Sequence, residues 1–179
     1  MRTVVCIASG PSLTAADCDL VRKSGAFAIV VNTSFRMAPW ADVLYAGDRQ
    51  WWNQYGAEAR AMMKECWTAS IDAAERYDVK YREARDFENS GYQAIELAVL
   101  EFGADRVIML GYDMQHTGGK RHWHEDHPGE MENADRVSDW PARFAELPMR
   151  FLEVETVNCS RETALTCFRR MALEEALGA

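Results

Sequence analysis

The chain has 179 residues, and its 20 Lys and Arg against 28 Asp and Glu give a formal net charge of −8. This acidic balance disfavours extended binding to nucleic acid, because phosphate backbones attract basic proteins. A hydrophobic fraction of 48% is typical of a folded protein, and the length fits one domain, residues 1–179, with a core of its own.

The cysteines and the apolar runs restrict the cellular setting. Five cysteines without a C-x-x-C spacing argue against a disulfide framework and a cysteine-based zinc site, so we expect reduced thiols. No basic segment followed by a long apolar one opens the chain, and no apolar run is long enough to cross a bilayer. We therefore expect a cytoplasmic protein without a membrane span.

The first half of the chain alternates short apolar runs with amphipathic segments. The first run ends in the tight turn Ser9-Gly10-Pro11-Ser12, and a helix follows for which Thr14 is the expected N-cap and Gly25 the expected C′ residue. A second helix is expected over Asp48–Lys64. The apolar runs are continuous, which predicts buried strands over Thr3–Ala8, Ala26–Val31, Ala41–Ala46, Cys66–Ile71 and, more weakly, Val79–Arg82.

The second half begins with the clearest helical pattern, which follows Asn89-Ser90-Gly91 and ends at Gly103, ahead of a strand over Arg106–Leu110. Glu130–Leu147 is predicted to be helical with a break near Trp140-Pro141, because proline removes a hydrogen bond inside a helix. A last strand is expected over Phe151–Val157. Ser160 would then cap a final helix with four inward-facing residues: Leu165, Phe168, Ala172 and Ala176.

This alternation predicts an α/β fold: a single Rossmann-like domain with a mostly parallel sheet and helices on both faces. The carboxyl ends of parallel strands converge at one edge, so polar residues there would line one pocket suited to a ribose and its phosphates. The expected pocket residues are Gly10, Pro11, Ser12, Asn32, Thr33, Asp48, Ser90 and Gly91. Each cluster alone also fits a simple turn or helix cap.

All four histidines, His116, His122, His124 and His127, lie in the segment that directly follows the strand Arg106–Leu110. Asp113 opens this segment, and further carboxylates lie between the histidines. Imidazoles suit general base catalysis because their unperturbed pKa lies near neutral pH. This histidine loop is the leading candidate for the chemistry, and the alternative is a solvated surface loop. Trp123 within it could stack on a ligand or anchor the loop to the core.

The spacing His122-x-His124-x-x-His127 offers enough imidazoles for a transition metal. Alternate residues of an extended loop point to opposite sides, however, and H-E-x-x-H is absent. We therefore expect no tightly bound metal.

The ordered motifs resemble a group of nucleotide-dependent enzymes. Cys6-Ile-Ala-Ser-Gly-Pro-Ser-Leu13, Asn32, Ser90-Gly91, Ile108-Met-Leu-Gly-Tyr-Asp113, the histidine loop and Val157-Asn-Cys-Ser160 occur in the same order as in bacterial lipooligosaccharide sialyltransferases. The layout is also similar to motility-accessory glycosyltransferase-like proteins, archaeal 6-hydroxymethylpterin diphosphokinases and many small phage proteins. The resemblance spans nearly the whole chain.

The resemblance to sialyltransferases implies that Gly10, Ser12, Asn32 and Ser90 hold a cytidine nucleotide. It further implies that His127, or else His124, is a general base that works without a metal. Tyr112 is the one clear counterpart of the tyrosines that assist the departing phosphate in that family, and this chain is short for an acceptor-binding lid. The resemblance to pterin diphosphokinases implies instead that Asp48 and Asp113 hold magnesium ions on a triphosphate.

We therefore expect a nucleotide-dependent transferase, most of all a glycosyltransferase that uses a CMP-sugar or related donor. Its catalytic residues would be His127, His124 and Asp113, and Tyr112 would join the nucleotide-binding set. The alternatives are a magnesium-dependent diphosphotransferase and a catalytically silent, nucleotide-binding phage accessory protein. The expected partners are a nucleotide or nucleotide-sugar, an unidentified acceptor and a second copy of the chain, with magnesium accompanying the nucleotide as the only cofactor.

Overall fold

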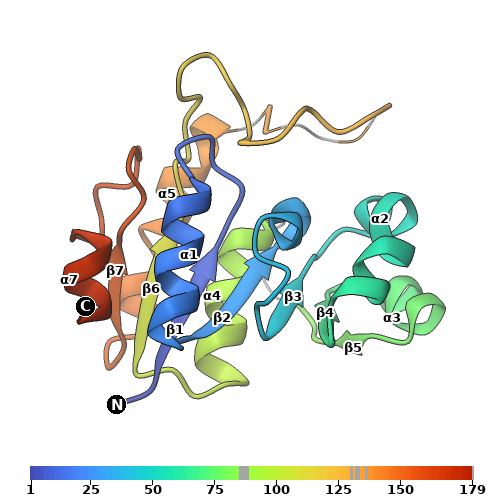
Figure 1. Ribbon diagram of the computed structural model, residues 1–179, viewed down its shortest axis with the longest axis horizontal. Helices are drawn as coiled ribbons and strands as arrows, with labels where there is room; N and C mark the ends of the chain where they lie inside the picture. Colours follow the sequence, from blue (N-terminus) through green and yellow to red (C-terminus); the bar gives the residue numbers. More distant parts are fainter. Residues whose placement is uncertain (85–88, 130, 132–133, 136, 179) are drawn as a thin grey trace.

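The computed structural model describes residues 1–84, 89–129, 131, 134–135 and 137–178. Its strands are β1 (Thr3–Ile7), β2 (Phe27–Val31), β3 (Val43–Tyr45), β4 (Glu65–Thr68), β5 (Lys80–Tyr81), β6 (Arg106–Leu110), β7 (Glu155–Asn158) and β8 (Arg169–Arg170). They form one sheet in the order β5-β4-β3-β2-β1-β6-β7-β8, and every neighbouring pair is parallel (Figure 1). The predicted parallel α/β sheet is therefore confirmed.

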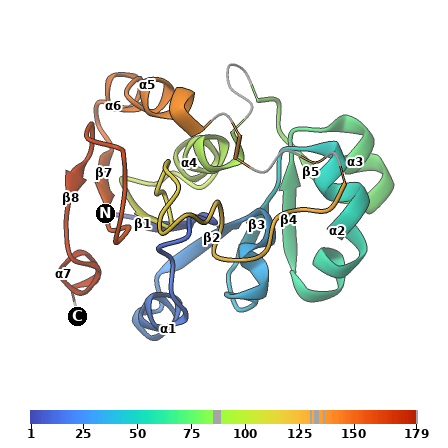
Figure 2. The same ribbon diagram turned by 90° about the horizontal axis from the view of Figure 1, so that it is seen from above.

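Helices cover both faces of the sheet, as predicted. They are α1 (Ala15–Ser24), α2 (Arg49–Met62), α3 (Ile71–Tyr77), α4 (Ser90–Leu100), α5 (Trp140–Phe144), α6 (Leu147–Arg150) and α7 (Leu173–Leu177). Val5 and Ile7 of β1 pack in the core shared with α1, α2, α3 and α7, whereas Val4 and Cys6 pack in the core shared with α4, α5 and α6 (Figure 2). No helix in the described ranges has the length and apolar character needed to cross a membrane.

Local sequence signals account for several boundaries. The Thr14 hydroxyl accepts a hydrogen bond from Asp17 N (3.2 Å), and the Asp17 carboxylate accepts one from Thr14 N (3.1 Å), so a capping box begins α1. Gly25 ends the helix with a φ of 69°, a left-handed conformation that suits glycine. β6 begins and ends at the predicted residues.

The predicted strand Cys66–Ile71 is wrong at its end, because the chain turns into a helix that the sequence analysis missed. The Thr68 hydroxyl accepts from Ser70 N (3.1 Å), and the Ser70 hydroxyl accepts from Ala73 N (3.2 Å). Ser70 is thus the N-cap of α3, and Ile71 is the first residue of that helix.

The helix predicted over Glu130–Leu147 is also wrong. Its described part holds only the short 3-10 turn η2 (Val137–Asp139), α5 and the first residue of α6, while residues 130, 132–133 and 136 lie outside the described residues. Pro141 and Pro148 each lie in the first turn of a new helix, where the missing N–H costs little. The predicted break near Trp140-Pro141 is confirmed by the start of α5, and Pro148 lies just beyond the predicted helix, in the first turn of α6.

The last predicted strand and helix need correction. The strand expected over Phe151–Val157 begins four residues later, because β7 pairs with β6 only from Glu155 onward. Ser160 caps no helix, since its hydroxyl accepts a hydrogen bond from Tyr112 N (2.8 Å). Leu165, Phe168 and Ala176 are buried as expected, but the first two lie outside any helix, and Ala172 is the exposed N-cap residue of α7.

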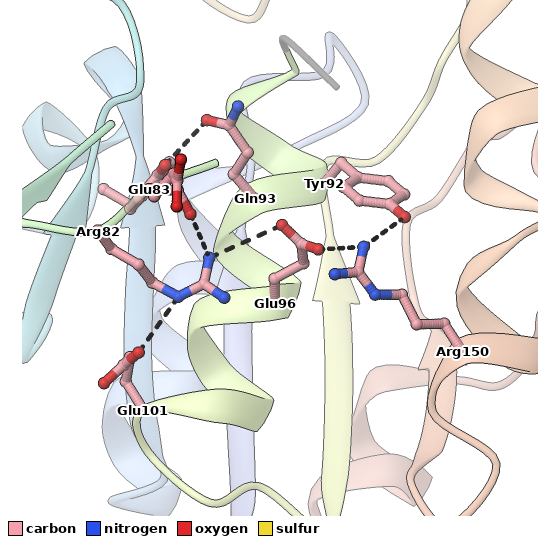
Figure 3. A network of polar contacts seen from close by, with 8 residues as sticks. Arg82, Glu83, Tyr92, Gln93, Glu96, Glu101 and Arg150 are labelled. Atoms are coloured by element: carbon pink, nitrogen blue, oxygen red, sulfur yellow. Dashed lines mark hydrogen bonds and ion pairs between the residues drawn. The ribbon is translucent and has the colours of Figure 1, made fainter. Parts of the chain in front are cut away.

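A buried carboxylate ties two peripheral segments to α4 (Figure 3). The Glu96 side chain is 2% exposed and pairs with the guanidinium groups of Arg82, at 3.8 Å, and of Arg150. Arg150 also donates to the Tyr92 hydroxyl (3.5 Å). Because Arg82 follows β5 and Arg150 ends α6, this network joins distant parts of the chain across one helix.

Candidate functional site

The order of the strands reverses between β1 and β6, since the chain progresses outward from β1 in both directions along the sheet. Ligands of open α/β sheets bind at such a switch point, beyond the carboxyl ends of the strands. A cavity of about 140 Å³ lies there, lined by the loops that follow β1 and β6 and by the start of α4.

The structure brings most of the predicted site residues to this cavity. Its lining includes Gly10, Pro11, Asn32, Asp48, Ser90, Gly91, Asp113 and His127. Asn32 follows β2 and Asp113 follows β6, so residues 81 positions apart face one space.

Four predicted residues lie elsewhere. The Thr33 hydroxyl accepts a hydrogen bond from Trp51 Nε1 (3.3 Å) in the core, and the Tyr112 hydroxyl donates to Gly91 O (3.0 Å) from a fully buried position. Ser12 lies behind Asp113 and donates to it. His124 lines a separate, outer hollow formed by residues 119–126.

Two glycines allow the loop after β1 to pass directly over the loop after β6. Gly10 N donates to Gly111 O (2.8 Å), and a Cβ on Gly10 would lie 2.2 Å from Asp113 Oδ1. A Cβ on Gly111, whose φ is 68°, would lie 2.6 Å from Ala8 O. Only glycine fits at either position without moving the backbone.

Asp113 holds these loops together through hydrogen bonds to both of its carboxyl oxygens. It accepts from Ser12 N (2.8 Å), from the Ser12 hydroxyl (2.7 Å) and from the Thr117 hydroxyl (3.0 Å). Burial raises the pKa of this carboxyl, although the hydrogen bonds from Ser12 and Thr117 act in the opposite direction. Both oxygens are therefore already engaged by donors of the protein.

Asn32 contributes a polar atom that has no such partner. Its backbone has a φ of 50°, which is uncommon for a residue other than glycine. Its side-chain Oδ1 is buried and accepts no hydrogen bond within the described structure, although the residue lines the cavity. Unpartnered buried acceptors are rare in native proteins, so this oxygen is available to a donor group of a ligand.

The N-terminus of α4 faces the same cavity. Asn89 caps it by accepting from Tyr92 N (3.0 Å), and the Ser90 hydroxyl accepts from Gly47 N (3.1 Å). Asn89, Ser90 and Gly91 all line the cavity. The positive end of the helix dipole favours an anionic group at this position.

The histidine loop leaves β6 and crosses above the sheet toward α2 (Figure 2). Trp123 anchors it, because Trp123 N donates to Ser9 O (3.2 Å) and its indole Nε1 donates to the Ser34 hydroxyl (3.2 Å). The indole also packs against the core. Of the two interpretations of Trp123, the structure thus supports the loop anchor.

Three of the four histidines form a compact group, which we call the histidine cluster: His122, His124 and His127. The ring centroids of His122 and His124 lie 4.8 Å apart with nearly parallel planes (7°). The His127 centroid lies 5.5 Å from that of His122 and 5.1 Å from that of His124. His116 is exposed, and its Nε2 lies 3.4 Å from Ala134 O.

Burial makes the histidine cluster neutral. It lowers the pKa of His122 to about 3 and of His127 to about 4, and the neighbouring imidazoles act in the same direction. Burial also lowers the pKa of His124. The three rings are thus uncharged at neutral pH.

Sequence reasoning missed several residues at the site. Tyr55 on α2 places its hydroxyl 3.0 Å from His127 Nδ1, across 72 positions of the chain. Arg121 adds a cation to the cavity wall and pairs with Asp135 (3.1 Å) and Asp126 (3.5 Å). No spacing in the sequence signals that α2 meets the histidine loop, although Arg121 adjoins His122, which belongs to the predicted histidine loop.

Among the described residues, no group of three or more His, Cys, Asp or Glu side chains is already arranged to hold a metal ion. Comparisons with protein-family models, curated proteins and solved structures found no significant match to this chain. The resemblance drawn from short motifs therefore stays a prediction, and the function has to be argued from the geometry of the site.

Proposed function

We propose that the protein is a nucleotide-dependent transferase, and that glycosyl transfer from a CMP-sugar or related donor is its favoured activity. The observation that carries this proposal is the polar cavity at the switch point of the sheet. There the start of α4, the Gly10 loop and the unpartnered Asn32 Oδ1 face one space. This is where open parallel sheets bind nucleotides.

The charges in the cavity suit a phosphate that is part of a larger ligand. The N-terminus of α4 and the Arg121 guanidinium attract an anion, whereas the Asp48 carboxylate opposes one on the same wall. Asn32 Oδ1 would accept from an N–H or O–H group of the ligand. At about 140 Å³ the cavity is smaller than sites that enclose whole ligands, so we expect the transferred group to extend toward the histidine loop.

His127 is the favoured general base, since it lines the cavity and is neutral. Its imidazole would take the proton of an acceptor hydroxyl as that oxygen bonds to the anomeric carbon of the donor sugar. The bond from that carbon to the phosphate oxygen would break, and CMP would leave. His124 lines only the outer hollow, which makes it second choice. The depressed pKa of His127 leaves the ring free to accept a proton and also weakens it as a base.

Magnesium-dependent diphosphate transfer has less support. The two candidate carboxylates already accept hydrogen bonds from the backbone, Asp48 from Gln50 N (2.5 Å) and Asp113 from Ser12 N (2.8 Å). Mg²⁺ binding sites use carboxylate oxygens that are free to coordinate. A metal on Asp113 would compete with bonds to both of its oxygens that hold the loops in place, whereas the bond from Gln50 uses only Oδ1 of Asp48.

A thermal-shift screen of cytidine, uridine, guanosine and adenosine nucleotides, with and without Mg²⁺, tests this proposal. We expect a cytidine nucleotide to raise the melting temperature, because a ligand bound only by the folded state stabilises it, by about 2.7 kcal/mol at 100 times its Kd. Asn32→Ala should remove most of the shift. Asn53→Ala, at an exposed asparagine on α2, is the matched control and should keep it.

The same screen separates the alternatives. Stabilisation by none of the nucleotides would contradict the proposal, and stabilisation only by ATP with Mg²⁺ would favour diphosphate transfer. If a CMP-sugar binds but no CMP is released over a broad panel of acceptors, the catalytically silent binding protein is favoured instead.

A further inference from the structure

The backbone of the histidine loop bends through residues 121–124, so the objection that alternate residues of an extended loop point apart does not apply. The rings of His122 and His124 instead lie nearly parallel with their centroids 4.8 Å apart. His127 completes a triangle with sides of 5.1 and 5.5 Å to these two rings.

The two nitrogens of each ring have different surroundings. Each Nδ1 lies near an oxygen: that of His122 near the Ser9 hydroxyl (3.4 Å), that of His124 near Glu125 O (2.6 Å) and that of His127 near the Tyr55 hydroxyl (3.0 Å). Because a carbonyl can only accept, Nδ1 of His124 carries the proton, and its Nε2 therefore has a free lone pair.

The Nε2 atoms of His122 and His124 are buried and have no hydrogen-bond partner in the described structure. Buried nitrogens of native proteins normally have a partner, and an orphaned one calls for an unseen water, ion or ligand. Two such atoms on neighbouring rings indicate that a single ion or ligand contacts both of them.

We propose that the histidine cluster, His122, His124 and His127, binds a divalent transition metal ion of the Zn²⁺ class through the Nε2 atoms. With Zn–N distances of about 2.0–2.1 Å and tetrahedral angles, three bound imidazoles have ring centres about 5 Å apart. The observed centroid distances of 4.8, 5.1 and 5.5 Å agree with that spacing, but the stacked, nearly parallel rings of His122 and His124 have to turn before both Nε2 atoms can reach one ion. Since His122 and His127 line the cavity, the fourth coordination position would face the ligand.

Metal binding has to draw the three Nε2 atoms toward one point, because the rings have the required spacing but do not yet surround a site. Rotations of the rings about their side-chain bonds would achieve this while the oxygens near Nδ1 stay in place. Metal-bound histidines usually donate their other N–H to an oxygen of this kind, which fixes the orientation of the ring. Ser9, Glu125 and Tyr55 are such second partners.

His127 cannot be a metal ligand and a general base at the same time, because either role uses the lone pair of the same imidazole. The surroundings of the three rings favour metal coordination over acid–base catalysis. A catalytic histidine needs a pKa near the working pH, which a carboxylate beside Nδ1 provides, whereas these rings meet hydroxyl and carbonyl oxygens. Neutral imidazoles are the form that coordinates a metal. The inference does not depend on the nucleotide proposal, because metal binding can be measured without a nucleotide.

Titration of the full chain, produced without an affinity tag and freed of metal by a chelator, tests the proposal. Zn²⁺ is followed by calorimetry and Co²⁺ by visible absorption, which reports tetrahedral coordination. We expect one ion per chain with intense tetrahedral Co²⁺ bands. His122→Ala and His124→Ala should each weaken binding at least 10-fold, while His116→Ala, the matched control outside the histidine cluster, should leave it unchanged.

Tyr55→Phe gives a second measurement that leaves all three imidazoles intact. Loss of an outer-shell partner typically weakens a metal 10- to 100-fold, so we expect at least a 10-fold effect. Circular dichroism of every metal-free variant checks that the chain is folded. If His122→Ala does not fold, Tyr55→Phe and His124→Ala carry the test.

Three results would overturn the metal site: no stoichiometric ion, equal loss of binding in His116→Ala, or tetrahedral Co²⁺ bands that survive in a folded His124→Ala variant. The nucleotide screen repeated on metal-free protein reports on the transferase proposal separately. A cytidine shift without metal binding would leave that proposal standing while refuting this one.

Discussion

The two sides of the switch-point cavity are built in opposite ways. On the side of the Gly10 loop, neither Gly10 nor Gly111 has room for a side chain, and Asp113 accepts three hydrogen bonds from neighbouring residues. In the histidine loop, two buried ring nitrogens have no partner within the described residues. Asn32 Oδ1, which follows β2 and lines the same cavity, has none either. Fully paired groups hold a structure in place, whereas unpaired ones are available to a ligand. The Gly10 loop and Asp113 therefore form the rigid wall of the cavity, and the histidine loop and Asn32 supply the unpaired atoms that a ligand could meet.

The largest effect is expected at the rigid wall. Gly10→Ala would place a Cβ 2.2 Å from Asp113 Oδ1 and 2.5 Å from Gly111 O, and neither loop can move without breaking hydrogen bonds. We expect a loss of about 3 kcal/mol in the free energy of unfolding, measured by urea denaturation.

Gly25→Ala is the control for this change. Gly25 has open space around it and a φ of 69°, so the substitution should cost only the backbone strain of about 1 kcal/mol. Equal losses in the two variants would mean that the Gly10 loop tolerates a side chain and is not the rigid side.

Asp113→Ala should cost somewhat less, about 2–3 kcal/mol, because it leaves the Ser12 N–H and two hydroxyl groups without an acceptor. Asp113→Asn retains one oxygen and should cost about 1 kcal/mol. Asp19→Ala, at an exposed carboxylate on α1, should change the free energy of unfolding by less than about 0.5 kcal/mol. A harmless Asp113→Ala would show that the loops hold together without this carboxylate.

The pH dependence of the free energy of unfolding gives a second test of the role of Asp113. Because the pKa of Asp113 is raised in the folded state, the unfolded chain loses this proton first as the pH rises, and the folded state is progressively disfavoured. The stability of the native protein relative to Asp113→Asn should therefore be greatest below pH 3.8. It should fall as the pH rises and level off above the raised pKa. Urea denaturation of both proteins across this pH range measures the difference in their free energies of unfolding. If the advantage of the native protein grew with pH, the raised pKa would be contradicted.

The smallest effect on stability is expected in the histidine loop. His122→Leu keeps most of the buried volume and removes a nitrogen without a partner, so the free energy of unfolding should change by less than about 1 kcal/mol in either direction. Thermal unfolding of metal-free protein provides the measurement. A loss as large as that of Gly10→Ala would place His122 with the rigid wall and remove the contrast between the two sides.

Some elements could be predicted because their signals are local. The capping pair Thr14 and Asp17 and the terminal Gly25 mark the two ends of one helix, and the apolar run Arg106–Leu110 forms a strand at the predicted residues. The structure of the segment after Ser160 could not be predicted. A serine hydroxyl can cap the N-terminus of a helix, and it can equally well accept a hydrogen bond from a distant backbone N–H. Here its hydroxyl accepts from Tyr112 N, 48 positions away, and that contact decides against a helix.

The residues of the candidate site likewise include some that local sequence signals predict and some that only the tertiary structure places. Polar residues at strand ends, such as Asn32 and Ser90, could be assigned to one edge because parallel strands all end there. Thr33 and Tyr112 adjoin such ends yet face the core, because the backbone leaves the strand geometry there. Thr33 lies in the 3-10 turn Asn32–Arg36, and Tyr112 follows Gly111, whose φ is 68°.

Short-range patterns of apolar and capping residues thus determined the parallel α/β sheet and the edge at which its polar residues gather. Only the tertiary structure decided that β1 and β6 are neighbours, that Gly10 passes within contact of Asp113, and that Tyr55 reaches His127. These contacts span 72 positions of the chain for Tyr55 and His127 and 103 for Gly10 and Asp113 and for paired residues of β1 and β6. The physical reason is that periodicity and capping depend on residues within a turn or two, whereas strand order depends on the packing of the whole core.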